Sequence, residues 1–332
     1  FDRPWEGSGS SGYQSIFRDG NIFRMYYKGW QIGFDLEARK IRSSVSTLSY
    51  AESRDGIHWH KPNLGLVEYA GSTDNNIVVM SGTIEGMEMI AGLMAVFRDE
   101  NPAAAPDARY KGFGVTNRPK GKGLVPFKSA DGLTWTPMAD EPVITRGAFD
   151  NQNLAFWSPG EGKCRAYWRY FAHGDDNTNT ANPIGVRAIR TATSGDFLHW
   201  EEAADVTYGR SPEQALYNTP IKPYARAPHI LLGFPARYVE RDVPSAQQKL
   251  PEAEHRALRR SINPRYGNAI TEGLLMASRD GVEFKRWDEA FLRPGIERPG
   301  TWNYGHQFIA WHPIETKSET PGAPDELSLY AP

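Results

Sequence analysis

Carboxylates stand in several polar segments that each come just before an apolar, strand-like run. Glu6 lies in DRPWEG, Asp150 in GAFDNQN and Glu213 in SPEQALYN. Two carboxyl groups with separated pKa values can cleave a glycosidic bond, because one protonates the leaving oxygen while the other attacks or activates water. These carboxylates therefore predict glycoside hydrolysis if the fold brings their segments together. Similar positions are held by Asp2, Glu85 and Glu88.

The same segments contain side chains suited to holding a sugar. Aromatic faces such as those of Trp5 and Trp302 can stack on the apolar face of a sugar ring. Arg226 and His229, in RAPH, follow a strand-like run. They are either a structural pair or a pair that binds an anionic or hydroxyl-rich sugar or a central ion. The predicted substrate-binding residues are Asp2, Trp5, Gln152, Asn153, Asn218, Arg226, His229, Trp302, Tyr304 and His306.

A short phrase that recurs four times indicates the elements that would position these residues. The phrase is a small residue or Ser, any residue, Asp, Gly, two further residues and an aromatic residue, as in SRDGIHW; the third copy, SGDFLHW, has Phe in place of Gly. Asp can accept backbone N–H groups and Gly accepts a positive φ, so each phrase predicts a tight turn between strands. We interpret its aspartates as turn formers and not as catalytic acids. They are Asp55, Asp131, Asp196 and Asp280.

Each repeat of about 75 residues contains a second hairpin, such as YQSIFRDGNIFRMYYKGW at 13–30, and repeats of this length favour a propeller. Two hairpins make four antiparallel strands, the unit of a propeller blade. Four units are complete, and a fifth begins at GHQFIAWHP (305–313). We therefore predict an all-β, five-bladed propeller forming a single domain over 1–332, and leave open whether the last blade is complete or is completed by other residues. A β-sandwich is the rival architecture, and 245–262 predicts a helical insertion in blade four.

In a propeller, the segments before each first strand converge at one end of the central channel. Glu6, Asp150 and Glu213 are thus expected to share one funnel. Whether hydrolysis retains or inverts configuration depends on the distance between the two working carboxylates.

Composition excludes several other classes of protein. The net charge of −2 and the lack of a Lys/Arg run argue against nucleic-acid binding. The single cysteine, Cys164, excludes an intramolecular disulfide and reads as a buried apolar side chain. No apolar run is long enough to span a bilayer.

No cofactor or metal site is predicted, with a structural cation in the channel left open. We expect a monomer or small homo-oligomer, secreted or periplasmic, with a cytoplasmic location as the alternative.

FDNQNLAFWSPGEGKCRAYW (149–168) resembles the Asp-containing segment before a first strand in the five-bladed propeller glycosidases of families 32 and 43 and their relatives. The segments at 50–78, 226–238 and 278–295 resemble an uncharacterised family-32-like subgroup. The resemblance implies Asp150 as the central stabilising acid, Glu213 as general acid, and Asp2 or Glu6 as nucleophile or base. It also implies exo-action on a furanoside or anhydro-sugar.

The chain departs from these families because their usual Asn-Asp-Pro-Asn, Arg-Asp-Pro and Glu-Cys motifs are absent. Asp99, in FRDENP, is interpreted as a turn residue. A non-catalytic carbohydrate-binding propeller and a protein-interaction propeller remain alternatives, since one fold hosts many functions. A phosphorylase or a lyase remains open within the enzyme class.

Overall fold

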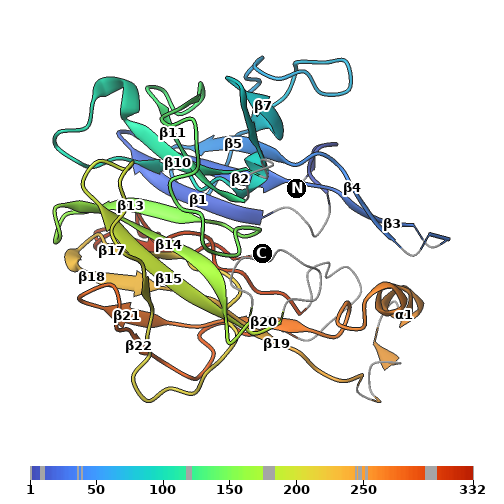
Figure 1. Ribbon diagram of the computed structural model, residues 1–332. Helices are drawn as coiled ribbons and strands as arrows, with labels where there is room; N and C mark the ends of the chain where they lie inside the picture. The colour runs from blue at the N-terminus through green and yellow to red at the C-terminus, as the bar shows by residue number, and fades with distance from the viewer. Residues whose placement is uncertain are drawn as a thin grey trace.

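The computed structural model describes residues 2–7, 12–35, 37–38, 40–116, 122–174, 184–243, 245, 249–250, 253–295 and 305–331. Its main sheets are arranged around one centre, as in a propeller (Figure 1). Each of the four main sheets contains four antiparallel strands, so the prediction of an all-β propeller with four-stranded blades is confirmed.

The strands of each blade follow one another from the axis outward. Blade 1 contains β1 (Gly12–Asp19), β2 (Ile22–Gly29), β5 (Thr47–Ser53) and β6 (Ile77–Met80). Blade 2 contains β9 (Phe97–Arg98), β10 (Tyr110–Thr116), β11 (Gly123–Ser129) and β12 (Thr136–Pro137). Blade 3 contains β13 (Leu154–Ser158), β14 (Lys163–Ala172), β15 (Val186–Ser194) and β16 (Ala204–Asp205). Blade 4 contains β17 (Ile221–Tyr224), β18 (Ala227–Gly233), β21 (Met276–Ser278) and β22 (Lys285–Arg286).

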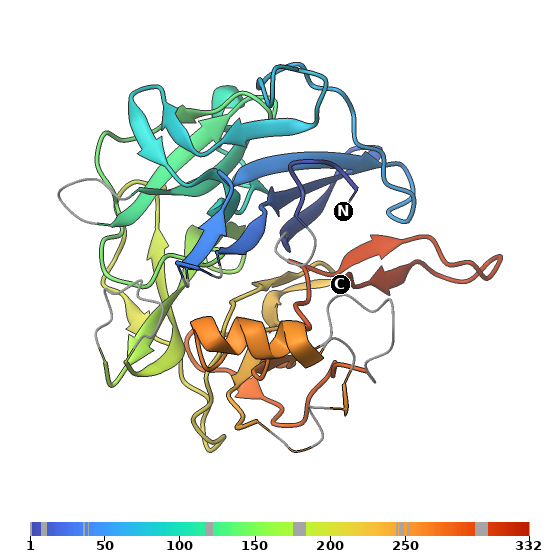
Figure 2. The same cartoon turned by 90° about the vertical axis from the view of Figure 1, so that its right-hand side faces the viewer.

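Shorter elements extend or connect the blades. Beyond β18 and β21, blade 4 continues as β19 (Ala236–Val239) paired with β20 (Ile270–Gly273). The helix α1 (Ala253–Ile262) lies between these two strands, which confirms the predicted helical insertion. Figure 2 shows α1 standing in front of the blades. The remaining elements are β3 (Ile32–Asp35), β4 (Lys40–Ser43), β7 (Gly82–Ile84), β8 (Met87–Met89), η1 (Ala91–Leu93) and η2 (Pro106–Ala108).

The structure shows four four-stranded blades, and the part of the described chain where a fifth was expected contains a two-stranded sheet, β23 (Ile314–Thr316) with β24 (Glu326–Ser328). The segment before β23 closes the ring of inner strands. Trp311 donates its backbone N–H to the Gln14 carbonyl (2.9 Å), and its indole N–H to the Ile221 carbonyl (2.8 Å). Trp311 thereby joins the first strand of blade 1 to the first strand of blade 4.

The repeated phrase forms the turn after the third strand of each blade, as predicted. In the second copy, Asp131 accepts the backbone N–H groups of Leu133 (2.7 Å) and Thr134 (2.8 Å), while Gly132 has φ +82°. The other copies repeat the bonds of the aspartate at 2.8–2.9 Å. These hydrogen bonds lower the pKa of all four aspartates, although burial opposes the shift.

The turns of blades 2, 3 and 4 pack against the second strand of the preceding blade. Arg24 on β2 donates to the Asp131 carbonyl (2.7 Å), and Tyr167 on β14 donates to the Gly281 carbonyl (2.8 Å). Phe113 on β10 stacks on Phe197, with ring centroids 4.8 Å apart. The repeat therefore holds neighbouring blades together. Its final aromatic residues belong to the core (Trp135, Phe284) or pack against it (Trp59, Trp200).

Candidate functional site

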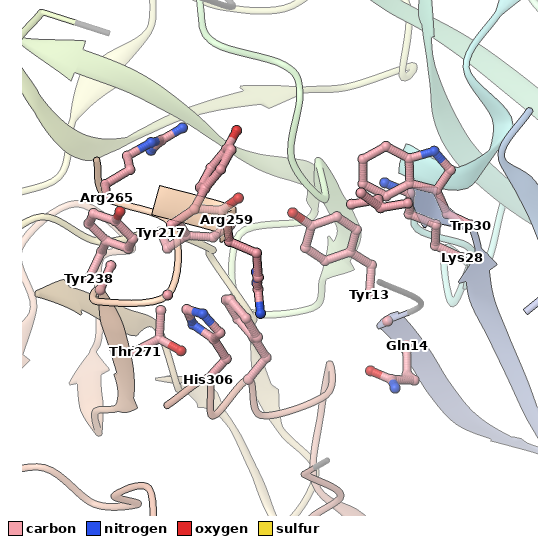
Figure 3. Close-up of a pocket in the computed structure, with 16 residues that line it drawn as sticks. Tyr13, Gln14, Lys28, Trp30, Tyr217, Tyr238, Arg259, Arg265, Thr271 and His306 are labelled. Carbon is pink, nitrogen blue, oxygen red and sulfur yellow. The ribbon is translucent and has the colours of Figure 1, made fainter. Parts of the chain in front are cut away.

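A cavity of about 280 Å³ lies between blade 1 and the β19–β20 extension of blade 4, with α1 beside it. Figure 3 shows side chains from the two sides facing each other across this space. The volume is near the lower end of small-ligand pockets. The lining residues are Gly12, Tyr13, Gln14, Lys28, Trp30, Ile32, Tyr217, Tyr238, Arg259, Arg265, Tyr266, Gly267, Ala269, Thr271, His306 and Phe308.

The blade 1 wall is built from the start of β1 and the end of β2, which meet because the two strands are antiparallel. Tyr13 has φ +55°, a conformation that costs a non-glycine residue about 1 kcal/mol or more. Gln152, from blade 3, holds it there by donating to the Tyr13 carbonyl (2.9 Å). Lys28 is buried with its ammonium 3.7 Å from the centre of the Trp30 ring, a favourable cation–π contact.

Beneath this wall, residues 150–153 use each side chain to fix another part of the site. Asp150 forms an ion pair with Arg169 on β14, whose side chain is almost fully buried. Asn151 donates to the Tyr217 carbonyl (2.9 Å), and Gln152 fixes Tyr13 as described above. Asn153 ties the segment to itself by donating to the Phe149 (3.0 Å) and Asn151 (2.8 Å) carbonyls. This segment therefore connects blade 3 to both walls of the cavity.

The blade 4 wall combines aromatic rings with cationic side chains. Tyr217 contacts Tyr238 and Phe308, with ring centroids 5.9 and 5.4 Å apart. Arg187 packs under Tyr238 with its guanidinium carbon 4.4 Å from the ring centre. On β20, Thr271 is buried in the wall. Its neighbour Glu272 pairs instead with Arg237, because adjacent residues of a strand point to opposite faces.

Burial shifts several pKa values around the cavity. It lowers the pKa of Lys28 to about 8, although the charge of Asp150 opposes this shift. It lowers the pKa of His306 to about 4, and the nearby charges of Arg259, Arg241 and Arg256 add to the shift. Burial also raises the pKa of Tyr13 well above its usual value. At neutral pH, Lys28 is therefore largely cationic, while His306 and Tyr13 are neutral.

The predicted N-terminal acids lie in a separate ion-pair cluster. Glu6 has a fully buried side chain that accepts hydrogen bonds from Tyr27 and from Lys61 (2.7 Å). Asp2 is exposed and also pairs with Lys61. Trp5 donates its indole N–H to Asn76 (3.0 Å). Tyr27 faces this cluster while the next residue of β2, Lys28, lines the cavity, so Glu6 stands on the opposite side of β2 from the cavity.

Other predicted residues are also outside the cavity lining. Glu213 is half-exposed and pairs with His173 (2.9 Å). Asn218 is buried and accepts the Ala236 backbone N–H (2.7 Å), which joins blade 4 to its extension. Arg226 pairs with Glu315 (2.5 Å) beside β23, and His229 is exposed on β18. Trp302 and Tyr304 lie outside the described residues.

Of the predicted residues that the structure describes, His306 lines the cavity, while Gln152 and Asp150 act on its blade 1 wall through Tyr13 and Lys28, and Asn153 holds the segment that carries them. The sequence reasoning missed Lys28, Trp30, Thr271 and Arg265. A usable signal existed for Lys28 and Trp30. In an antiparallel blade, the C-terminal end of the second strand lies beside the N-terminal end of the first strand, where the site was expected. Tyr13 begins the first hairpin, YQSIFRDGNIFRMYYKGW, and Tyr217 lies in the polar segment SPEQALYN. No sequence signal placed Arg265 or Thr271, because the insertion around α1 determines their position.

Within the described ranges, no cluster of three or more His, Cys, Asp or Glu side chains is arranged to hold a metal ion. The helix of the described chain is not long and apolar enough to cross a membrane. Cys164 is buried among the core residues, and burial raises its pKa to about 12.

No protein-family model matches the chain. Uncharacterised proteins from two strains of Mycobacterium tuberculosis are 28% identical to it over 138 residues. This match covers 41% of the chain and 36% of each relative, so the chain matches about a third of the length of these relatives.

Solved structures share the fold at low sequence identity. An endo-arabinase from Bacteroides thetaiotaomicron is 10% identical with a TM-score of 0.52, covering 98% of this chain and 96% of its own. A thermostable family-43 glycoside hydrolase is 10% identical with a TM-score of 0.52, covering 99% and 91%. An N-acetylgalactosamine deacetylase from F. plautii is 10% identical with a TM-score of 0.53, covering 100% and 82%. The chain therefore has the fold of β-propeller glycoside hydrolases.

Proposed function

We propose that the protein is a glycoside hydrolase that binds a sugar unit in the cavity and cleaves its glycosidic bond beside Asp150. The observation that carries this proposal is a cavity with aromatic walls and a carboxylate, Asp150, behind its blade 1 wall. Its aromatic walls suit the apolar face of a sugar ring. The small volume favours action on the terminal unit of a chain, and both furanosides and pyranosides are candidates.

In this proposal Asp150 supplies the carboxylate of the reaction. Its charge acts on Tyr13 and on Lys28, two groups of the cavity wall. Acting as general base, Asp150 takes a proton from water as the water oxygen bonds to the anomeric carbon. The leaving oxygen must receive a proton as its bond to that carbon breaks. Lys28 and Tyr13 are the candidate donors of this proton. Lys28 is the better one, because its pKa of about 8 is closer to neutral pH than the pKa of Tyr13.

Glu6 and Glu213 have a weaker case for direct participation. Glu6 is held by Tyr27 and Lys61, and Glu213 pairs with His173. Asp150 is also paired, but its charge acts on two groups of the cavity wall, Tyr13 and Lys28. The proposal therefore keeps Asp150 as its catalytic carboxylate, acting as general base, and treats Glu6 and Glu213 as secondary candidates.

We further propose that β23 and β24 belong to a fifth blade of a single domain. The ring contacts of Trp311 support this proposal. Tyr330 supports it too, because it donates its hydroxyl to the Gly56 carbonyl and so contacts the blade 1 turn as a preceding blade does elsewhere.

A non-catalytic sugar-binding propeller is the second candidate function. It is favoured by one observation: within the described residues, the side chains that line the cavity include no Asp or Glu. Such a protein would keep the aromatic walls and use Asp150 only to hold Arg169.

The test is a panel of aryl glycosides and oligosaccharides with pyranoside and furanoside ends, assayed for released reducing sugar. The variant Asp150→Asn is the paired control, since it keeps the shape of the side chain and can still accept a hydrogen bond from Arg169. Sugar release by the wild type that the variant loses supports the proposal. If no substrate is turned over and both proteins bind the same sugar equally well, the protein is a binding propeller instead.

A further inference from the structure

The described lining of the cavity is strongly cationic. It contains Lys28, Arg259 and Arg265, and none of its described members is Asp or Glu. The chain as a whole has a net charge of −2, so this concentration of positive charge is local. Charge of one sign in a partly enclosed site raises the local concentration of ligands of the opposite sign.

The electrostatics of the blade 4 wall point the same way. Arg259, Arg241 and Arg256 all lower the pKa of His306, and Arg265 and Arg169 contribute to lowering that of Arg187, after burial. Two carboxylates affect the described groups of the walls. Asp150 pairs with Arg169 behind the blade 1 wall, and Glu240 affects Tyr238. Around His306 the described charges are therefore arginines.

Polar atoms in this wall also lack hydrogen-bond partners. Within the described part of the chain, the Arg265 Nε, Thr271 Oγ1 and His306 Nδ1 atoms are buried and have no hydrogen-bond partner. Thr271 and His306 are neighbours, because the Thr271 backbone N–H bonds the Gly305 carbonyl (2.6 Å). A buried polar group without a partner costs roughly 1–3 kcal/mol. A ligand that pairs with these atoms would remove that cost, although Arg265 would have to keep its hydrogen bond with Tyr238 or exchange it for one to the ligand.

We propose that the blade 4 wall recognises an acidic group on the sugar, a carboxylate or a sulfate, through Arg265, Thr271 and His306. This inference rests on the proposed function and narrows its substrate class to acidic saccharides. All three side chains can donate to an oxyanion: a guanidinium N–H, a hydroxyl, and the N–H of a neutral imidazole. The opposite wall, with Lys28 and Trp30, is left to face the glycosidic bond.

The arrangement favours an acidic sugar over a neutral one for a specific reason. A neutral hydroxyl could bond the unpartnered atoms, but it would bring no negative charge to the cationic lining formed by Lys28, Arg259 and Arg265. A carboxylate or sulfate does both, and charge-assisted hydrogen bonds are about twice as strong as neutral ones. The aromatic rings around the wall then distinguish a sugar from a free anion, because acetate or sulfate offers them no ring face.

The test is isothermal titration calorimetry of the wild-type protein with matched ligands. The acidic probes are glucuronate, galacturonate and galactose 6-sulfate, the neutral probes are glucose and galactose, and the free anions are acetate and sulfate. We expect at least one acidic sugar to bind about tenfold or more tightly than its neutral counterpart. We also expect its affinity to fall as salt rises. The sulfate and carboxylate probes decide which acidic group is recognised.

Two variants test whether the preference for acidic sugars comes from Arg265. Arg265→Gln should weaken binding of the acidic sugar by about tenfold or more while leaving binding of the neutral sugar within about twofold. Arg18→Gln is the matched control, since Arg18 is an exposed arginine at the far end of β1. It should change neither affinity. The wild-type comparison between acidic and neutral sugars remains decisive if Arg265→Gln does not fold.

The outcomes separate this inference from the proposed function. Equal affinity for acidic and neutral sugars, no binding of any sugar, or equal binding of free anions and acidic sugars would overturn the inference. Hydrolysis of neutral glycosides alone would also overturn it while leaving the hydrolase proposal standing. Selective binding of an acidic sugar without turnover of any acidic glycoside would support the acidic site and reject the hydrolase.

Discussion

The turn aspartates and Asp150 place the same carboxyl group in two different kinds of surroundings. Asp131 accepts two backbone N–H groups of its own turn, and the turn packs against the neighbouring blade. Asp150 forms an ion pair with a buried arginine from another strand, and its charge reaches two groups of the cavity wall. The first kind of aspartate satisfies local backbone groups and stabilises the fold. The second is held by tertiary contacts and remains half-exposed, where it can meet a ligand.

The comparison extends to the residues around each carboxylate. Around the turns, glycines and aromatic rings fill space so closely that an added methyl group would collide with a neighbour. A Cβ at Gly132 would stand 2.4 Å from the Tyr26 hydroxyl oxygen. Around the cavity, by contrast, polar atoms are left without partners and a lysine is buried with a lowered pKa. Functional sites often keep such unfavourable features because a ligand relieves them.

The largest expected effect separates Asp150 from a turn aspartate. On a substrate found with the panel, Asp150→Asn should lower kcat by about a thousandfold, since an acid–base group contributes about 10²–10⁴. Asp131→Ala should leave kcat unchanged and lower the free energy of unfolding by about 1 kcal/mol, the value of a lost cap. Steady-state kinetics and urea unfolding of both variants measure this. A loss of kcat in Asp131→Ala, with none in Asp150→Asn, would reverse our assignment of the two roles.

The next effect concerns blade packing at the turns. Gly132→Ala should lower the free energy of unfolding by roughly 2–4 kcal/mol, because a left-handed φ and an overlap with Tyr26 both oppose the methyl group. Gly20→Ala is the control. Gly20 also has a positive φ (+62°), but no atom lies within 4 Å of an added Cβ, so its cost should be about 1–2 kcal/mol. Equal losses in urea unfolding would show that the turn does not pack as described.

A third effect is the pH dependence of stability from His306. Its pKa is about 4 in the folded protein and 6.5 when unperturbed, so the unfolded state binds the proton first as pH falls. Stability is therefore full above pH about 6.5 and should fall by roughly 3 kcal/mol as pH drops to about 4.

Urea unfolding at pH 7.5 and pH 4.5 tests this contribution, with His306→Gln as the comparison. The variant should lose clearly less stability than the wild type over this range. Some loss should remain, because burial also lowers the pKa of His312. Identical pH dependence in the two proteins would mean that the imidazole of His306 is not buried among arginines.

The smallest expected effect is a gain of stability from Lys28→Met. The pKa of Lys28 is about 8 in the folded protein against 10.5 unperturbed, so at neutral pH the folded state bears the cost of a buried ammonium. Methionine removes that cost and should raise the free energy of unfolding by roughly 1 kcal/mol, after the loss of the contact with Trp30. In the wild type, the free energy of unfolding should rise between pH 8 and 10.5, because the folded protein loses the Lys28 proton before the unfolded chain does. A less stable variant at pH 7 would show that Lys28 contributes mainly to folding.

Much of the fold could be predicted because its signals are local. Asp131 and Gly132 specify their turn through bonds within four residues, and the alternation in IFRMYYKG specifies a strand. The fourfold recurrence of such phrases then indicates blades. The helix was predicted from 245, while the structure has α1 beginning at Ala253. A fifth unit was expected from Gly305 onward; in the described chain this part contains a two-stranded sheet, β23 with β24, and its membership of a fifth blade stays a proposal.

The sequence by itself determined the elements of this protein, including the polar segment 150–153 just before the inner strand β13. Only the tertiary structure decided what surrounds that segment. Glu6 was as good a candidate as Asp150 until alternation along β2 placed it on the far side of Lys28. Arg265 and Thr271 reached the cavity because the extension of blade 4 brings residues 265–271 opposite the start of β1. Contacts between residues so far apart in the chain depend on how the blades pack, and no local pattern records them.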